Sequence, residues 1–203
     1  FNRFAVAPPL PEVVELAKPR APILAPRPVK PATNWQAVAA GADGVAAAEV
    51  AIDTLTGAMR VLRAELVQDC GESLNPAIDL GQIEGAFVQG MGWLTTEELV
   101  WDSKGKLRTH GPSTYKIPGS RDVPPVFNVK LLDNAPSREA TIFRSKAVGE
   151  PPLMLAISVF RAISDAIASI ADYRVLPHLD APATPERVLF AVEELQARLE
   201  AGE

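Results

Sequence analysis

The sequence predicts an α+β fold, a mixed domain in which antiparallel hairpins pack with helices. The first observation is a pair of strand-like apolar runs, residues 45–53 and 58–69, joined by a short segment in which Gly57 supplies a turn residue. The second is that the helical segments do not alternate regularly with single strands, as they would in a parallel βαβ sheet. We therefore expect hairpins with helices beside them.

Further strands are predicted after the first hairpin. Residues 97–102 and 107–110 flank the polar turn 103–106 and are expected to form a second hairpin. Residues 126–133 alternate between apolar and polar side chains, which indicates a half-buried strand, and residues 140–145 are expected to form another.

Three helices are predicted from their apolar patterns and start signals. The first covers residues 78–94, with Asn75 near its start, and the second covers 153–171 directly after two prolines. The third begins at Pro185, and Thr184 is its expected N-cap because its hydroxyl can accept a bond from a free backbone amide of the first turn.

The first of these helices carries several glycines. Gly81 and Gly85 lie four residues apart, and Gly90 follows them. Each glycine in a helix costs about 1 kcal/mol relative to alanine, so the pattern indicates that something packs very close to the helix backbone. Another helix, which is the more common case, and a bound ligand both fit this pattern.

The first forty-four residues predict an extended linker rich in proline and alanine. The eight prolines of its first part are Pro8, Pro9, Pro11, Pro19, Pro22, Pro26, Pro28 and Pro31. Proline at this density removes backbone donors and blocks both helix interiors and central strands. We therefore assign residues 1–44 to the linker and 45–203 to the folded domain.

Composition argues against several classes of protein. The net charge of −5 gives no basic field for a nucleic acid, and no run of eighteen apolar residues predicts a transmembrane helix. The start has neither an initiator Met nor a leader pattern, so no signal peptide is expected and the chain reads as processed or as part of a longer one. The single cysteine, Cys70, fits a reducing cytoplasm, where we expect the protein to reside.

Few side chains in the sequence could ligate a metal directly. Two histidines and one cysteine cannot form an ordinary zinc or iron–sulfur site. A metal would therefore have to be carried by a cofactor or share ligands with another chain, and we predict no metal ligand in this chain.

Glu150 is the most suggestive single residue. It lies between a glycine and two prolines, at the predicted junction of a strand and a helix. The free amides of a helix N-terminus favour an ionised carboxylate, which could act as a general base. A carboxylate that only caps the helix would occupy the same position, and the residues alone leave both interpretations open.

Two other positions suggest contacts with a ligand. Gln82 and Gln89 lie seven residues apart, hence on nearly the same helix face, and their amides could serve a polar cofactor or simply face solvent. Lys146 could be an ion-pair partner, a phosphate contact or a solvated strand end.

Five motifs follow one another along the chain. They are Glu49-Val50 with Asp53–Gly57, Ser73–Asp79, Gly81–Gly90, Gly111–Pro118 and Ser145–Pro152. In this order they resemble the C-terminal region of the molybdopterin-binding subunit of xanthine dehydrogenases, within the xanthine oxidase and aldehyde oxidase family of molybdenum hydroxylases. The Pro-rich segment does not resemble what precedes this region in the family.

The resemblance implies part of a molybdenum-cofactor-binding domain and a reaction. That reaction is oxidative hydroxylation of hypoxanthine or xanthine, with water as the source of oxygen. By resemblance Glu150 is the catalytic base, Gln82 contacts the molybdopterin and Val148 approaches it through its backbone. The implied cofactor is molybdenum–molybdopterin, in which the pterin holds the metal.

The resemblance also implies partners. The remaining portion of the molybdenum subunit, [2Fe–2S] clusters and FAD are expected in other domains or subunits, so the chain should be active only with them. An aldehyde oxidase or another azaheterocycle hydroxylase, and a truncated assembly module without turnover, are the alternatives.

Overall fold

The computed structural model describes residues 4–6, 35–39 and 42–202, with side chains from residue 44 onward. Most of the predicted linker 1–44 lies outside the described residues. Two short strands within it, β1 (Phe4–Val6) and β2 (Trp35–Ala39), pair with the sheet described below. The boundary at residue 44 stays a prediction.

A mixed five-stranded sheet forms the centre of the described fold. β3 (Ala42–Asp53) and β4 (Met59–Gln68) form the predicted first hairpin, with an irregularity in register between Glu49 and Val50. β1 and β2 both pair antiparallel with β3. On the other side, β5 (Val126–Leu131) runs parallel to β4.

The turn of the first hairpin depends on Gly57. Its φ of +69° is a left-handed conformation that favours glycine, and its amide donates to the Asp53 carbonyl at 2.8 Å. A Cβ at this position would also overlap the carbonyl oxygen of Pro185. Gly57 therefore allows both the turn and the close approach of the last helix.

The three remaining strand predictions, which follow the first hairpin, had different outcomes. Residues 126–133 do form a strand, but β5 is parallel to β4, because the chain crosses over through a helix before reaching it. The second hairpin is reduced to one bridge, Trp101 with Leu107, around the predicted turn. The strand predicted at 140–145 is wrong, because a tight turn, η1 (Ile142–Arg144), takes its place.

The three predicted helices are confirmed. α2 (Pro76–Thr95) is capped by Asn75, whose side chain accepts from the Ile78 amide. α3 (Ile157–Ser169) continues a 3₁₀ segment, η2 (Pro151–Ala156), and α4 (Pro185–Glu200) is capped by Thr184 as expected.

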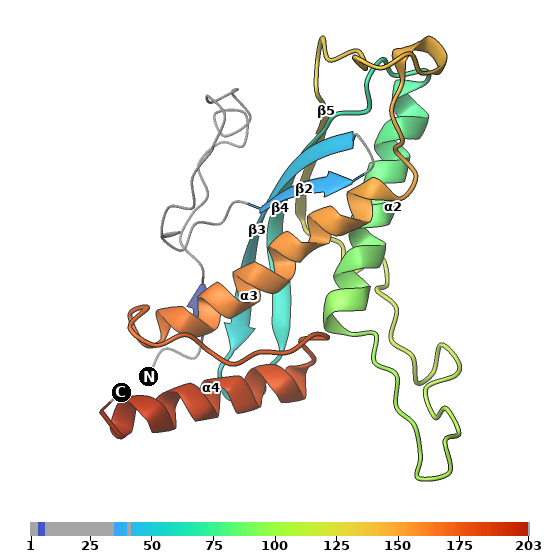
Figure 1. Cartoon of the computed structure of the whole chain (residues 1–203). Helices are drawn as coiled ribbons and strands as arrows, with labels where there is room; N and C mark the ends of the chain where they lie inside the picture. The colour runs from blue at the N-terminus through green and yellow to red at the C-terminus, as the bar shows by residue number, and fades with distance from the viewer. Residues whose placement is uncertain (1–3, 7–34, 40–41, 203) are drawn as a thin grey trace.

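The helices bury one face of the sheet. α3 runs along the sheet beside α2, and α4 lies at the end of the sheet where the β3–β4 turn is found (Figure 1). The core includes Ile52, Leu66 and Ile163, and the Phe87 ring packs against Phe127 of β5 with centroids 5.4 Å apart. These contacts confirm the α+β class, and α2 also packs directly against η2.

One stretch, Pro151–Ser169, is long and apolar enough to cross a bilayer by composition alone. However, 56% of its apolar window is buried inside the molecule. Its side chains include Val159, Ile163 and Ile167 of the core, so its apolar character is explained by packing against the sheet.

Gly57→Ala is expected to lower the Tm more than Gly105→Ala. Both glycines have positive φ, +69° and +76°, so both substitutions incur the left-handed strain of about 1–2 kcal/mol. Only at Gly57 would the new methyl group overlap backbone, whereas described atoms leave Gly105 open. Thermal unfolding of the purified protein that contains this chain measures the difference, and equal Tm shifts would contradict the packing role.

Candidate functional site

The segment Ser145–Pro152 is attached to the end of β4 by backbone pairing. Ser145 forms an antiparallel bridge with Gly71, and the Lys146 amide donates to the Cys70 carbonyl at 2.8 Å. The Glu72 amide donates to the Arg144 carbonyl at 3.0 Å. Residues that are more than seventy positions apart therefore continue the sheet locally beyond β4.

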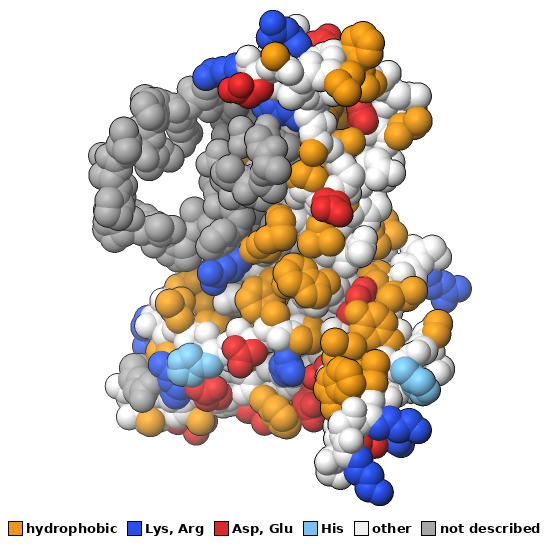
Figure 2. Space-filling model, turned by 45° about the vertical axis from the view of Figure 1, so that its right-hand side comes forward, with side chains coloured by type: hydrophobic (Ala, Val, Ile, Leu, Met, Phe, Trp, Pro, Cys, Tyr) orange, Lys and Arg blue, Asp and Glu red, His pale blue; other side chains and the backbone are white. Residues whose placement is uncertain are grey.

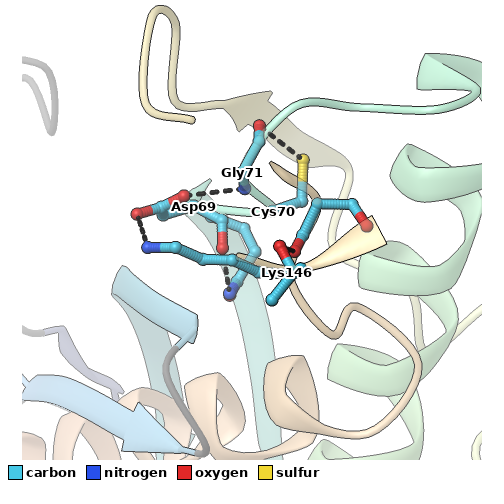
Figure 3. A network of polar contacts seen from close by, with 7 residues as sticks. Asp69, Cys70, Gly71 and Lys146 are labelled. Atoms are coloured by element: carbon cyan, nitrogen blue, oxygen red, sulfur yellow. Dashed lines mark hydrogen bonds and ion pairs between the residues drawn. The ribbon is translucent and has the colours of Figure 1, made fainter. Parts of the chain in front are cut away.

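An ion pair reinforces this attachment. The Lys146 ammonium lies 2.5 Å from Oδ2 of Asp69, and their side chains are only 17% and 9% exposed (Figure 3). The Gly71 amide donates to Oδ1 of the same carboxylate at 2.8 Å. Of the three interpretations of Lys146, the structure supports the ion-pair partner.

Cys70 lies within this attachment and is a buried free thiol. Burial, followed by the nearby Asp79 carboxylate, raises the pKa of the Cys70 thiol. A raised pKa keeps the thiol protonated at neutral pH and therefore weakly nucleophilic. Cys70 is thus suited to packing and not to chemistry.

The next residues, 147–149, form an open loop. Among the described residues, their backbone groups neither donate nor accept a hydrogen bond to other backbone groups. The Val148 side chain is partly buried and packs against the core. The loop is therefore fixed by a side chain while its backbone donors stay available to another molecule.

Glu150 occupies the N-cap position of η2, but its side chain makes no capping hydrogen bond. Its backbone carbonyl accepts from the Leu153 amide at 3.0 Å, and its side chain is exposed. The interpretation of Glu150 as a helix-capping acid therefore lacks its defining bond. The carboxylate is presented on the surface of the described chain, and its catalytic role stays a prediction.

Gln82 lies beside this loop. Its Oε1 is 3.8 Å from the position that a Cβ on Gly149 would take, so α2 and the Ser145–Pro152 motif meet there. Gln89 lies seven residues further along α2, about two helical turns, and is exposed. The structure thus brings Gln82 and Val148 to neighbouring positions on one surface.

The glycines of α2 separate into two kinds. A Cβ on Gly90 would overlap the Leu153 carbonyl and lie 2.8 Å from the Ala156 Cβ, so Gly90 allows η2 to pack against α2. A Cβ on Gly81 or Gly85 would meet no described atom within 4 Å. Helix packing therefore explains Gly90 and leaves the helix backbone at Gly81 and Gly85 accessible.

These features together fit a polar organic cofactor. The Gln82 amide, the free backbone amides of 147–149 and the exposed backbone at Gly81 and Gly85 offer neutral donors and acceptors, as a pterin requires. Within the described part of the chain, no group of three or more His, Cys, Asp or Glu side chains could hold a metal ion.

A separate pocket of about 270 Å³ lies at the other end of α2. Its lining includes Met59, Met91, Thr95 and Arg121, and it contains none of the predicted site residues. The surface around Gln82 and Glu150 is instead open, so a site there would need further walls from outside the described residues.

Sequence reasoning missed Asp69 and Gly71 as parts of the site. Asp and Gly after a strand are typical of a turn, which gives no sign of a pairing with Lys146. The only sequence signal was Lys146 itself, for which an ion pair was one of three interpretations.

Comparisons with known proteins identify the family and the fold of this chain. The family described as molybdopterin cofactor-binding domain matches residues 27–124, which include Gln82 and end before Val148 and Glu150. Xanthine dehydrogenase/oxidase of Felis catus is 51% identical over 162 residues, covering 77% of this chain and 12% of that protein. Xanthine dehydrogenase of Dictyostelium discoideum is 55% identical over 148 residues, covering 71% and 11%.

A solved structure shows the same fold. Quinoline 2-oxidoreductase from Pseudomonas putida 86 matches with a TM-score of 0.67 and 34% identity, over 75% of this chain and 19% of that one. The chain therefore spans only a small part of the proteins it matches. Its sequence, fold and motifs place it in the xanthine dehydrogenase family of molybdenum hydroxylases, as part of the molybdopterin cofactor-binding region.

Proposed function

We propose that this chain is part of the catalytic subunit of a xanthine dehydrogenase, an oxidoreductase that hydroxylates hypoxanthine and xanthine in purine catabolism. The observation that carries the proposal is the meeting of two family motifs, where Gln82 of α2 lies beside Gly149, the residue before Glu150. The identity of 51% and 55% to two xanthine dehydrogenases supports this substrate class.

The proposed roles rest on the family resemblance, and the positions of the side chains are consistent with them. The exposed Glu150 carboxylate acts as the general base and accepts the proton of the attacking hydroxyl. Gln82 binds the molybdopterin through its amide, and Val148 does so through its free backbone groups. When bound, the molybdenum cofactor supplies a two-electron acceptor for the conversion of a C–H to a C–OH bond.

The remaining parts of the enzyme are also proposed. The rest of the molybdenum subunit would complete the site, while [2Fe–2S] clusters and FAD in other domains or subunits would carry the electrons away. Large apolar side chains are exposed on the described surface and gather on the face shown in Figure 2. Among the described residues, the exposed large hydrophobic side chains include Trp93, Leu99, Trp101, Ile117, Ile142 and Phe143. Exposed apolar surfaces of this kind suit contacts with further protein. We also propose a cytoplasmic location for the assembly.

A second candidate function is the hydroxylation of a different azaheterocycle. The similarity to the solved quinoline 2-oxidoreductase, at 34% identity, favours this candidate. A general base at Glu150 would serve either substrate, so the proposed base does not decide between them. Turnover of purines and quinolines by the purified complete enzyme separates the two candidates. An enzyme complex that lacks molybdenum would instead support the non-catalytic assembly module.

Glu150→Gln in the complete enzyme is expected to lower kcat by about 10²–10⁴-fold, the range for loss of a general base. The molybdenum content should stay unchanged, because the substitution keeps the size of the side chain. Steady-state kinetics with xanthine and metal analysis measure both. Glu193→Gln, at an exposed carboxylate on α4, is the matched control and should behave as the unaltered enzyme. Full turnover in Glu150→Gln would show that the base is another group.

Gln82→Ala is expected to weaken retention of the cofactor by about 10–100-fold, as loss of a supporting hydrogen bond to a metal cofactor does. Molybdenum and pterin contents after dialysis provide the measurement. Gln89→Ala removes an exposed amide from nearly the same helix face and should retain the cofactor. Equal losses in both variants would mean that α2 as a whole, and not Gln82, determines cofactor retention.

A further inference from the structure

The four residues 147–150 lie between two anchors. After them, η2 packs so closely against α2 that a Cβ on Gly90 would overlap the Leu153 carbonyl. Before them, Lys146 is attached to the residues that follow β4. Residues 147–149 make no backbone hydrogen bonds to described backbone groups, so apart from the packing of the Val148 side chain on the core their position depends on these two anchors.

The anchor before the loop consists of Asp69, Gly71 and Lys146, which we call the Asp69 clamp. The two oxygens of the Asp69 carboxylate bind different donors, the Lys146 ammonium at 2.5 Å and the Gly71 amide at 2.8 Å. Lys146 is held twice, because its own amide donates to the Cys70 carbonyl at 2.8 Å. Figure 3 shows these groups converging from the end of β4 and from the loop segment.

The Asp69 carboxylate of the clamp is buried and Lys146 is partly buried, so few positions of the two side chains keep both charges paired. Asp69 is 7% exposed, so its charge is separated from most of the solvent and relies on its partners. A surface ion pair could separate at little cost, but a buried carboxylate left without its cation cannot. The burial therefore favours one position of Lys146.

The backbone that enters the clamp is also constrained. Phe143 and Arg144 both have positive φ, 49° and 56°, which is uncommon for residues other than glycine. The Arg144 carbonyl accepts from the amides of Glu72 and Ser137 and lies against Gly71, where a Cβ would overlap it. Gly71, at a φ of +66°, thus permits the close approach that brings Lys146 to Asp69.

We propose that the Asp69 clamp positions the loop 147–150, and that Asp69 and Lys146 are positioning residues for Val148 and Glu150. This role rests on the proposed function, because it assigns the loop to cofactor binding and proton transfer. Neither side chain touches the reacting atoms. Their effect would be to hold the Glu150 carboxylate within the narrow range of positions that proton transfer tolerates.

The test uses the complete enzyme with Lys146→Met and Asp69→Asn. The second variant keeps an acceptor for the Gly71 amide and removes only the charge. Both are expected to lower kcat by about 10–100-fold, as loss of supporting groups around a metal site does, while KM stays unchanged. Hydrogen exchange provides a readout independent of turnover, because the amides of Glu72 and Lys146 should exchange faster in both variants.

Two controls separate positioning from loss of stability. Glu98→Gln removes the partner of Arg187 in a half-exposed ion pair of 2.8 Å and should change neither kcat nor exchange in the clamp. Val192→Ala removes core volume in α4 and should lower the Tm while kcat at a permissive temperature stays unchanged. A clamp variant that resembled Val192→Ala in both respects would overturn the proposal.

The outcomes also distinguish this proposal from the proposed function. Loss of turnover in Glu150→Gln together with normal kcat in both clamp variants would overturn the clamp and leave the function standing. Full turnover in Glu150→Gln would remove the proposed role of Glu150 as the base, while the exchange data would still test the clamp. If neither clamp variant accumulates, exchange in the unaltered enzyme decides, since rapid exchange of the Glu72 and Lys146 amides would overturn the proposal.

Discussion

The buried ion pair between Asp69 and Lys146 joins two parts of the chain that lie 77 residues apart. α2 begins shortly after Asp69, and η2 with α3 begins shortly after Lys146. The pair therefore sets where both helical segments start relative to the sheet. The meeting of Gln82 with Gly149, on which the candidate site depends, follows from this arrangement together with the close packing of η2 on α2 at Gly90.

Local signals predicted the local structure well. The caps Asn75 and Thr184 and the turn at Gly57 each depend on bonds within a few residues, so the sequence contains all the information they need. The failure at 140–145 has a physical reason. Arg144 turns into a left-handed conformation so that its carbonyl can accept from Glu72 and Ser137, and contacts with distant residues override the apolar pattern of the segment.

The candidate site shows the same division. The glycines of α2 predicted close packing by another helix or by a ligand; helix packing explains Gly90, whereas Gly81 and Gly85 lie open in the described structure. Periodicity could not separate them, because the difference lies in what another segment places opposite each glycine. The ion pair of Asp69 with Lys146 could not be predicted for the same reason, because only the fold brings the two residues together. Glu150 was found through its motif, and the roles of Glu150, Gln82 and Val148 remain predictions.

The exposure of Glu150 limits what this chain can do by itself. Proton transfer within an active site gains from the exclusion of water, which strengthens the electrostatic interactions inside it. The described residues place Glu150 and Gln82 on an open surface, and large apolar side chains such as Ile142 and Phe143 stand exposed near the same motif, each at 76%. Further protein packed over this surface would exclude water from the proposed base and would also cover the exposed apolar side chains. This geometry fits the proposal that the surface is one wall of an active site, positioned by the Asp69 clamp, and that further protein supplies the other walls.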